Sequence, residues 1–385
     1  MDRDFYTPDH ERFREVVKEF VAREVTQQHL DKWNEDHLTG REVWVAAGKQ
    51  GIIGLSTPAE FGGPGLDDFR YRMVVCEELA KVGATSLQSS FGLQDDILIP
   101  YIADLGNDEQ KARWLPGMAA GELIGAIAMT EPGTGSDLKG IKTTGTKVDG
   151  GWRVTGSKTF ITSGIQSDLV VTVARTDPAG GSDGFTLLVV ERDMEGFSRG
   201  RKLDKVGLVA QDTAELYFDN VFVPDANVLG SVGGGFRQLM RHLPLERLGI
   251  VANAITSAQS AFDWTLDYTN QREAFGQPIA DFQNSRFVLA EIATELDVTR
   301  AYVDKCVLAY NEGKLSAVDA AKAKWWCSEI QNRIIDRCVQ LHGGYGYMLE
   351  YPIARAFTDA RIQKIYGGTN EIMKQIIGRD LTGRR

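Results

Sequence analysis

The chain has 385 residues, of which 43% are hydrophobic and 25% charged, and its formal net charge at pH 7 is −10. The length exceeds that of one typical domain, and the composition is that of a folded globular protein. The acidic balance disfavours nucleic acid as a partner, because phosphate binding needs a concentrated basic surface. No apolar run approaches the roughly 20 residues that span a bilayer, so we expect no membrane span.

The N-terminal sequence and the cysteines predict a compartment. Residues 1–5 begin neither an apolar signal-peptide core nor an Arg-rich transit peptide, so cytoplasmic residence is the default expectation. The four cysteines show no C-x-x-C spacing, which indicates free, buried thiols in a reducing compartment. His242 lies four residues before Glu246, but no third ligand is near in the sequence, and we expect no metal site.

Helical periodicity marks both ends of the chain. Within residues 7–119, apolar residues from Phe13 to Val21 recur at i, i+3, i+4, i+7 and i+8, a stripe that must pack against other helices. The helical pattern returns at Phe236 and continues nearly to the end, in runs such as 317–339 that are long enough for bundle helices.

The middle of the chain, from about Gly121 to Gly230, has a different pattern. Short runs rich in Val, Thr and Phe, such as 169–174 and 216–223, alternate with turn residues. Short strands at this spacing favour an antiparallel sandwich or barrel over βαβ units. Helices, then strands, then helices predict three structural units.

A turn motif follows the apolar run 123–129, where residues 130–137 read TEPGTGSD. Two glycines and a proline force a tight turn that leaves backbone N–H groups free for an anion or a cofactor edge. The string is not G-x-G-x-x-G and no helical pattern follows it, which disfavours a Rossmann nucleotide site. On its glycines alone, the motif is best interpreted as an ordinary β-turn.

An aromatic residue and a hydroxyl are two residues apart in the segment 158–164, which reads KTFITSG. The period of two in a strand places Phe160 and Thr162 on one face. Phe160 could stack on a flat ring while Thr162 forms a hydrogen bond with the edge of that ring. A phenylalanine in a β core is the commoner alternative.

Two glycine-containing segments lie in the C-terminal part. Residues 272–279 read REAFGQPI, and Arg272 supplies a forked donor suited to a pyrophosphate. In isolation Arg272 would be a helix-terminal arginine that bonds the last carbonyls, with Gly276 as the cap. Residues 340–347 read QLHGGYGY, and the glycines permit a close approach of the backbone to a cofactor.

Two further segments bear on the position of a catalytic carboxylate. Residues 243–248 read LPLERL, and residues 365–371 read IYGGTNE. With the strings above, they resemble the acyl-CoA dehydrogenase family over residues 11–379, and the C-terminal part is most similar to its long-chain members. Most members have Tyr-Glu-Gly-Thr where this chain has Gly367, whereas long-chain and isovaleryl members carry the catalytic Glu in a Leu-x-x-Glu-Arg-Leu helix. The resemblance therefore implies Glu246 as the catalytic base.

The resemblance also implies a fold, a cofactor and partners. The fold is mainly α with a central β domain, comprising an N-terminal helical domain (1–120), an antiparallel β domain (121–231) and a C-terminal four-helix bundle (232–385). The activity is FAD-dependent dehydrogenation of an acyl-CoA thioester, with an electron-transfer flavoprotein as the acceptor. In the family, the segments at Arg272 and Gln340 come from neighbouring subunits and contact one FAD, so we expect a homotetramer.

The resemblance assigns roles to the matching residues. The backbone N–H of Gly367 would donate to the thioester oxygen, a function that does not need a side chain. Substrate contacts are expected at Ser136, Pro244, Arg247 and Gly368. Contacts with FAD are expected at Met129, Thr130, Gly135, Ser136, Phe160, Ile161, Thr162, Arg272, Phe275, Gln283, Gln340, Gly343, Gly344, Thr369 and Glu371.

The surroundings of Glu246 support its role on physical grounds. Three neighbouring leucines would desolvate the carboxyl group and raise its pKa, as proton abstraction next to a thioester requires. Pro244 interrupts the helical pattern and would kink the helix at a cost of roughly 3 kcal/mol, which fits a functional site. Without the resemblance, Glu246 would be interpreted as a surface carboxylate paired with Arg247 or another arginine.

Other carboxylates and other functions stay open. Glu131 and Glu371 lie in cofactor-binding strings and rank below Glu246. An acyl-CoA oxidase or a flavin monooxygenase on the same fold would use oxygen as the acceptor. A non-catalytic flavoprotein that binds acyl-CoA is favoured by Gly367 and opposed by Glu246. The sequence does not determine the preferred acyl chain length.

Overall fold

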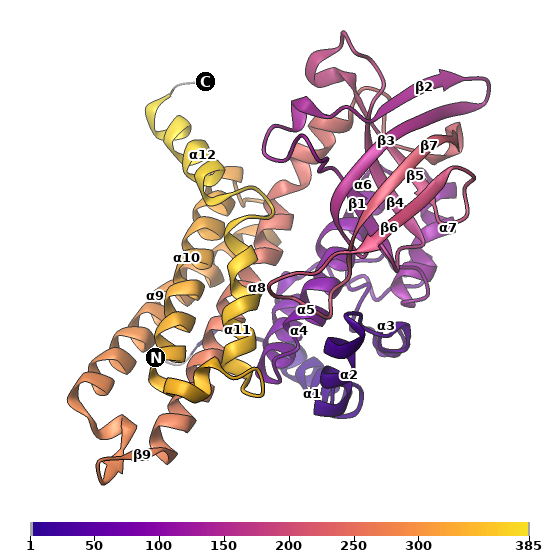
Figure 1. Cartoon of the computed structure of the whole chain (residues 1–385). Coiled ribbons are helices and arrows are strands. Elements are labelled where there is room, and N and C mark those ends of the chain that lie inside the picture. The colour runs from indigo at the N-terminus through magenta and orange to yellow at the C-terminus, as the bar shows by residue number, and fades with distance from the viewer. Residues whose placement is uncertain (1–2, 384–385) are drawn as a thin grey trace.

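The computed structural model describes residues 3–383, and its N-terminal part consists of helices (Figure 1). The elements are α1 (Pro8–Glu24), α2 (Gln27–Asp36), α3 (Arg41–Lys49), η1 (Ala59–Phe61), α4 (Phe69–Lys81), α5 (Thr85–Gly92), the π-helix η2 (Leu93–Leu98), α6 (Ile99–Leu105) and α7 (Asp108–Ala119). Of the predicted stripe on α1, Val17, Phe20 and Val21 are buried in the N-terminal core, whereas Val16 is exposed.

The middle of the chain forms one eight-stranded sheet. The strands are β1 (Gly125–Ala128), β2 (Thr144–Val148), β3 (Gly151–Thr162), β4 (Leu169–Arg175), β5 (Phe185–Glu191), β6 (Phe197–Lys202), β7 (Thr213–Pro224) and β8 (Val228–Leu229). Their order is β6-β7-β3-β2-β4-β5-β8, with β1 paired to β4 off this path. Most pairs are antiparallel as predicted, but β1 and β2 each pair with β4 in parallel, which the strand spacing did not indicate.

The C-terminal part is a bundle of long helices with a short hairpin at one end (Figure 1). Its elements are α8 (Gly235–Gln271), β9 (Glu273–Ala274), β10 (Gln277–Pro278), η6 (Ile279–Asp281), α9 (Gln283–Asn311), α10 (Ala317–His342), η7 (Gly343–Tyr347), α11 (Pro352–Ala360), η8 (Arg361–Lys364) and α12 (Asn370–Thr382). The predicted fold class, mainly α with a central β domain, is confirmed.

The long helix α8 packs against both the N-terminal helices and the C-terminal bundle. Its residues Val251 and Ile255 lie in one hydrophobic cluster with Met73 of α4 and with Ile330 of α10. Full burial of each such aliphatic side chain stabilises the fold by about 1.5–3 kcal/mol. Because it is packed by both the N-terminal helices and the bundle, α8 is a fixed element from which catalytic side chains can project.

All four cysteines are buried and none is in a disulfide bond, as expected. Within residues 3–383, no helix is long and apolar enough to cross a membrane. The same residues contain no group of three or more His, Cys, Asp or Glu side chains that could hold a metal ion.

Candidate active site

Glu246 projects from α8 into the interior, where its side chain meets Tyr101 of α6. Only 5% of Glu246 is exposed, and the hydroxyl of Tyr101 donates a hydrogen bond of 2.7 Å to Glu246 Oε1. Burial raises the pKa of Glu246 to about 7, although the hydrogen bond from Tyr101 and the charge of Arg247 oppose this rise. A desolvated carboxyl group with a near-neutral pKa is suited to general-base catalysis.

The turn of α8 before Glu246 contains Pro244. The helix continues through this proline from Gly235 to Gln271, so Pro244 does not end it. Proline lacks an N–H, and the carbonyl of Met240 therefore loses its usual partner four residues on. The interruption lies directly beside the buried carboxyl group.

Arg247, the next residue on α8, is also buried, and its Nε has no hydrogen-bond partner. Its Nη2 would lie 4.0 Å from a Cβ atom at Gly368. Burial lowers the pKa of Arg247, while the charge of Glu246 raises it. A buried donor without a partner is costly in a native structure and commonly marks a ligand position. Arg247 therefore offers a donor to a group bound beside Glu246.

Gly367 and Gly368 form a turn that faces this part of α8. Their φ angles are +63° and +91°, a region that residues with a side chain rarely adopt. A Cβ at Gly367 would lie only 2.2 Å from Cδ1 of Ile250 on α8. The segment around Glu246 and the segment around Gly367 therefore lie side by side in the structure.

A buried lysine holds the turn from the other side. Lys324 of α10 donates to the carbonyl oxygen of Gly368 at 2.8 Å and to Asn370 Oδ1 at 3.2 Å. The amide of Asn370 in turn donates to Glu329 Oε1 at 2.9 Å. Burial lowers the pKa of Lys324 to about 8. These contacts fix the orientation of the Gly367–Gly368 backbone.

The two rival carboxylates have different surroundings. Glu131 is buried but accepts hydrogen bonds from Lys158 Nζ and from the backbone N–H groups of Lys142 and Thr143. Burial alone would raise its pKa, but these contacts outweigh burial and lower it. Glu371 lies exposed in the first turn of α12. Neither combines burial with a raised pKa, so the geometry favours Glu246.

The predicted cofactor residues of the β domain lie around the end of β1. Thr159 N donates to the carbonyl oxygen of Thr130 at 2.9 Å, which joins the turn after β1 to β3. Phe160 is 69% exposed with a φ of 59°, and the register of β3 shifts between Lys158 and Ile161. Phe160 thus sits at a bulge rather than in a regular strand, so the strict period of two does not apply there.

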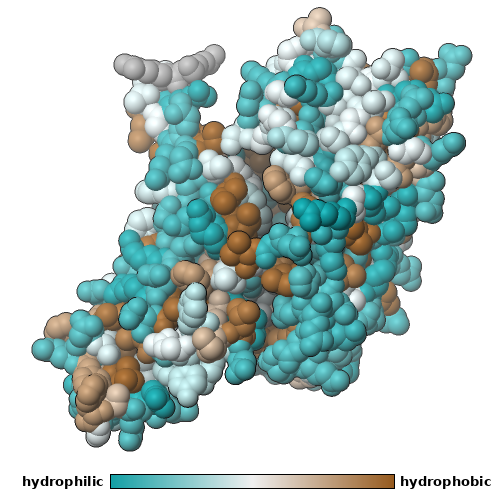
Figure 2. All heavy atoms as spheres, in the orientation of Figure 1, coloured by the Kyte–Doolittle hydropathy of each residue, from teal (hydrophilic) through white to brown (hydrophobic). Residues whose placement is uncertain are grey.

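This surface is open to a flat ligand. A Cβ at Gly133 or Gly135 would meet nothing within 4 Å, and Ser136 is exposed beside them. Figure 2 shows a hollow between the bundle and the β domain, bordered by hydrophobic side chains. An exposed aromatic ring next to an open glycine turn fits the ring system of a flavin. Of the other predicted residues here, Met129, Thr130 and Thr162 are half-buried, and the side chain of Ile161 is buried.

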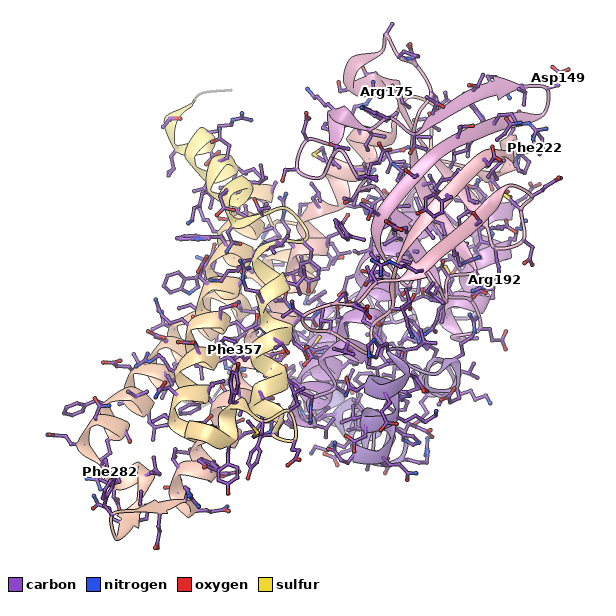
Figure 3. The ribbon with its side chains drawn as sticks, in the orientation of Figure 1. Asp149, Arg175, Arg192, Phe222, Phe282 and Phe357 are labelled. Atoms are coloured by element: carbon purple, nitrogen blue, oxygen red, sulfur yellow. The ribbon has the colours of Figure 1, made fainter. Side chains whose placement is uncertain are left out.

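Thr369 and Glu371 lie at the start of α12, and the other predicted cofactor residues gather at the end of the bundle that carries the β9–β10 hairpin. Phe275, at the β9–β10 hairpin, is 97% exposed, and its ring lies 6.2 Å from that of Phe282. Figure 3 shows Phe282 at the opposite end of the molecule from Asp149 and Phe222 of the sheet. A Cβ at Gly343 or Gly344 would meet nothing within 4 Å. Arg272, Gln283 and Gln340 are exposed at the same end.

The expectation that Arg272 and the 340–347 segment come from different subunits needs correction. The Arg272 guanidinium lies 5.5 Å from the ring of Tyr345, and Tyr268 donates to the carbonyl oxygen of His342 within one chain. The physical reason is that α8 and α10 are neighbours and end at the same end of the bundle. One chain therefore presents Arg272 and Gln340 together, at the end of the bundle away from the sheet that carries Phe160.

Several residues at the site carried no signal in the sequence. Tyr101 is 145 positions from Glu246, and nothing around it marks a functional residue. Lys324 lies within an ordinary amphipathic helix pattern. The spacing of His242 from Glu246 predicted no metal site and gave no other role for this residue. In the structure, the ring of His242 stacks on that of Tyr101.

The fold and the site together define a class of protein. A helix–sheet–helix chain carries a buried carboxyl group of raised pKa beside a buried arginine, and it has two exposed aromatic and glycine-rich surfaces for a cofactor. These are features of an oxidoreductase that uses a large planar cofactor and a protein-derived base.

The chain belongs to the acyl-CoA dehydrogenase family. The family models for the N-terminal, middle and C-terminal domains of acyl-CoA dehydrogenase match residues 7–122, 126–221 and 233–382. The protein is an oxidoreductase of this family, and its cofactor is FAD. The family resemblance of the sequence motifs is thereby confirmed.

Individual relatives agree over nearly the whole chain. The long-chain specific acyl-CoA dehydrogenase, mitochondrial, of Sus scrofa is 46% identical over 381 residues, covering 98% of this chain and 88% of that protein. The isovaleryl-CoA dehydrogenase, mitochondrial, of Oryza sativa subsp. japonica is 37% identical, covering 96% and 90%. The crystal structure of acyl-CoA dehydrogenase from Geobacillus kaustophilus is 45% identical with a TM-score of 0.95, covering 99% and 100%.

Proposed function

We propose that this protein dehydrogenates an acyl-CoA thioester to the trans-2-enoyl-CoA, with Glu246 as the catalytic base. The observation that carries the proposal is the buried carboxyl group of Glu246, whose pKa is raised to about 7. A hydrogen on the carbon next to a thioester is a weak acid, so its removal needs a desolvated base of this kind. Ionised Glu246 accepts that proton at its carboxylate.

The charge that develops on the thioester oxygen needs donors. The backbone N–H of Gly367 is one candidate, and the turn that carries it is held by the bond between Lys324 and the Gly368 carbonyl. The unpartnered Nε of Arg247 is suited to binding the same end of the substrate. Ser136, Pro244 and Gly368 complete the proposed substrate contacts.

FAD, when bound, would supply the redox chemistry as the acceptor of the hydride that leaves the β-carbon. Four residues of one chain would contact the flavin ring of FAD: Thr130, Ser136, Phe160 and Thr162. Thr369 and Glu371 would contact FAD close to Glu246. Arg272, with its forked donor, suits the pyrophosphate. The remaining proposed contacts are Met129, Gly135, Ile161, Phe275, Gln283, Gln340, Gly343 and Gly344.

The separation of the two cofactor surfaces supports an oligomer. Arg272 lies beside β9, at the end of the bundle away from the sheet, whereas Phe160 belongs to β3 of the sheet, so one FAD would contact both kinds of surface only if two chains contribute. We propose a homotetramer that passes electrons to an electron-transfer flavoprotein.

Anaerobic mixing with acyl-CoA tests the function directly. Bleaching of the flavin by substrate supports a dehydrogenase, and unchanged absorbance with bound acyl-CoA identifies the non-catalytic binder that Gly367 suggests. Rapid reoxidation in air, with formation of peroxide, identifies an oxidase instead. Turnover of a series of acyl-CoA lengths with an artificial acceptor then determines the preferred chain length.

A further inference from the structure

Glu246 and its neighbour Tyr101 form a buried pair in which only one oxygen of the Glu246 carboxylate is hydrogen-bonded. Tyr101 is fully buried and donates to Glu246 Oε1 at 2.7 Å. Within residues 3–383, Glu246 Oε2 accepts no hydrogen bond from a protein group. One oxygen of the carboxylate is therefore held, and the other is available.

Tyr101 is itself held in place by a second pair of side chains. The ring of His242 stacks on the Tyr101 ring with centroids 4.3 Å apart and an interplanar angle of 28°. His242 Nε2 lies 3.1 Å from Asp104 Oδ2. Asp104 is one turn after Tyr101 on α6, and His242 is one turn before Glu246 on α8, so each helix contributes two residues on one face.

The direction of Tyr101 depends on the π-helix that precedes α6. Residues Leu93–Leu98 form this π-helix, and α6 begins at the next residue, Ile99. One residue added to an α-helical turn rotates the following side chains by about 100°. Single-turn π-helices frequently occur at functional sites. In the orientation that follows this π-helix, the hydroxyl of Tyr101 reaches Glu246 of α8.

We propose that Tyr101 is a positioning residue of the reaction, whose hydroxyl holds Oε1 of Glu246 so that Oε2 faces the substrate, with the Asp104–His242 pair fixing the Tyr101 ring. The inference rests on the proposed role of Glu246 as the base. A hydroxyl donor also favours the ionised carboxylate. Burial, the larger effect, raises the pKa of Glu246, and the Tyr101 bond limits that rise.

Other ionisable groups surround the pair on every element that packs against it. They are Arg241, His242 and Arg247 of α8, Asp104 of α6, Asp96 of η2 and Lys324 of α10, and Arg241 is ion-paired with Asp104. Burial lowers the pKa of His242, which favours the neutral ring, while the neighbouring Asp104 opposes this shift. Asp96 is paired with Arg72. All these groups are unchanged in Tyr101→Phe, so that variant reports on the hydroxyl alone.

The test compares Tyr101→Phe with Tyr302→Phe in the FAD-loaded protein. Tyr302, on α9, is a control because its hydroxyl contacts the backbone carbonyl of Asp319, at 3.5 Å, and the thiol of Cys306, and not Glu246. Two quantities are measured against pH: the rate of flavin reduction by acyl-CoA, and the infrared band of the protonated Glu246 carboxyl, isolated by subtracting the Glu246→Gln spectrum.

In Tyr101→Phe we expect both titrations to move to higher pH by about one unit, which slows reduction about tenfold at pH values below the parental pKa. Tyr302→Phe should titrate like the parent. Titrations at the parental pH in Tyr101→Phe, with any rate loss uniform across pH, would overturn the proposal. If Tyr101→Phe does not fold, His242→Leu, which releases the Tyr101 ring, must shift the titrations in the same direction, and an unshifted His242→Leu overturns the proposal.

The Glu246→Gln variant distinguishes failure of the proposed base from failure of the proposed role of Tyr101. If Glu246→Gln reduces its flavin at the parental rate, the proposed base is wrong. If Glu246→Gln is inactive while Tyr101→Phe behaves like the parent in both titrations, only the role of Tyr101 is wrong.

Discussion

The side chain of Ile250 occupies the space into which a side chain at Gly367 would project, with Cδ1 only 2.2 Å from the position of a Cβ atom there. Ile250 lies one turn after Glu246 on α8. Helix α8 thus carries the carboxyl group of Glu246. Four residues later, Ile250 of the same helix fills the space where most of the family carries its catalytic Glu side chain.

Moving the base to position 367 should require a change at Ile250. In a Glu246→Gln background, we expect Gly367→Glu alone to recover little flavin reduction, because the new side chain meets Ile250 and the backbone has a positive φ that costs about 1–3 kcal/mol. Adding Ile250→Ala should raise the recovered rate. Equal rates with and without Ile250→Ala would show that Ile250 does not close this position.

Removal of the base should abolish chemistry but not binding. Glu246→Gln keeps the size of the side chain but cannot accept a proton, so flavin reduction should fall by at least ~10²–10⁴-fold. FAD content and acyl-CoA affinity should be retained. Glu371→Gln, which changes the exposed rival carboxylate on α12, tests the alternative base. Parental reduction in Glu246→Gln together with loss in Glu371→Gln or Glu131→Gln would reject the assignment.

The same substitution should change how stability depends on pH. The pKa of Glu246 is about 7 in the folded protein against an ordinary value of 4.5, so between these values the folded state binds more protons than the unfolded state. The Glu246 contribution therefore destabilises the fold progressively as pH rises through this window. Relative to the parent, Glu246→Gln should gain about 3 kcal/mol between pH 4.5 and pH 8, measured by urea unfolding. A difference that stays constant with pH contradicts the raised pKa.

Lys324 should stabilise the turn at Gly368. Lys324→Met leaves a buried carbonyl without its donor, which costs about 1–3 kcal/mol. Because the Gly367 backbone is then less fixed, reduction by substrate should also slow. Lys322→Met is the control, since this lysine lies on the same helix but is only half-buried and pairs with Asp319. Thermal unfolding of both variants checks the expectation, and equal melting temperatures would contradict it.

Complementation between chains should reveal a shared FAD site. Phe160→Ala and Arg272→Ala should each weaken FAD binding, because each removes one of the two separated surfaces. In mixed oligomers, one site receives both intact surfaces, so co-expression should restore part of the flavin absorbance. No restoration in mixed oligomers, or a flavin-loaded monomer in light scattering, would refute the shared site.

Much of the fold followed from local patterns. Val17, Phe20 and Val21 predicted a buried helix face because periodicity is a property of neighbouring residues, and the same holds for the strands and the bundle helices. The parallel pairing of β1 and β2 with β4 was not predictable in this way, because pairing depends on contacts between distant segments. The adjacency of Arg272 and Tyr345 was missed for the same reason.

The sequence by itself determined which chemical groups are present: a carboxylate at Glu246, none at Gly367, and glycines where the backbone turns sharply. Only the tertiary structure decided what those groups can do. Glu246 is a strong base candidate because α6 brings Tyr101 against it and burial raises its pKa, and neither effect is encoded within the LPLERL segment. A pKa is set by the dielectric surroundings and charges within a few ångströms, and in a folded chain those come from residues far away in sequence.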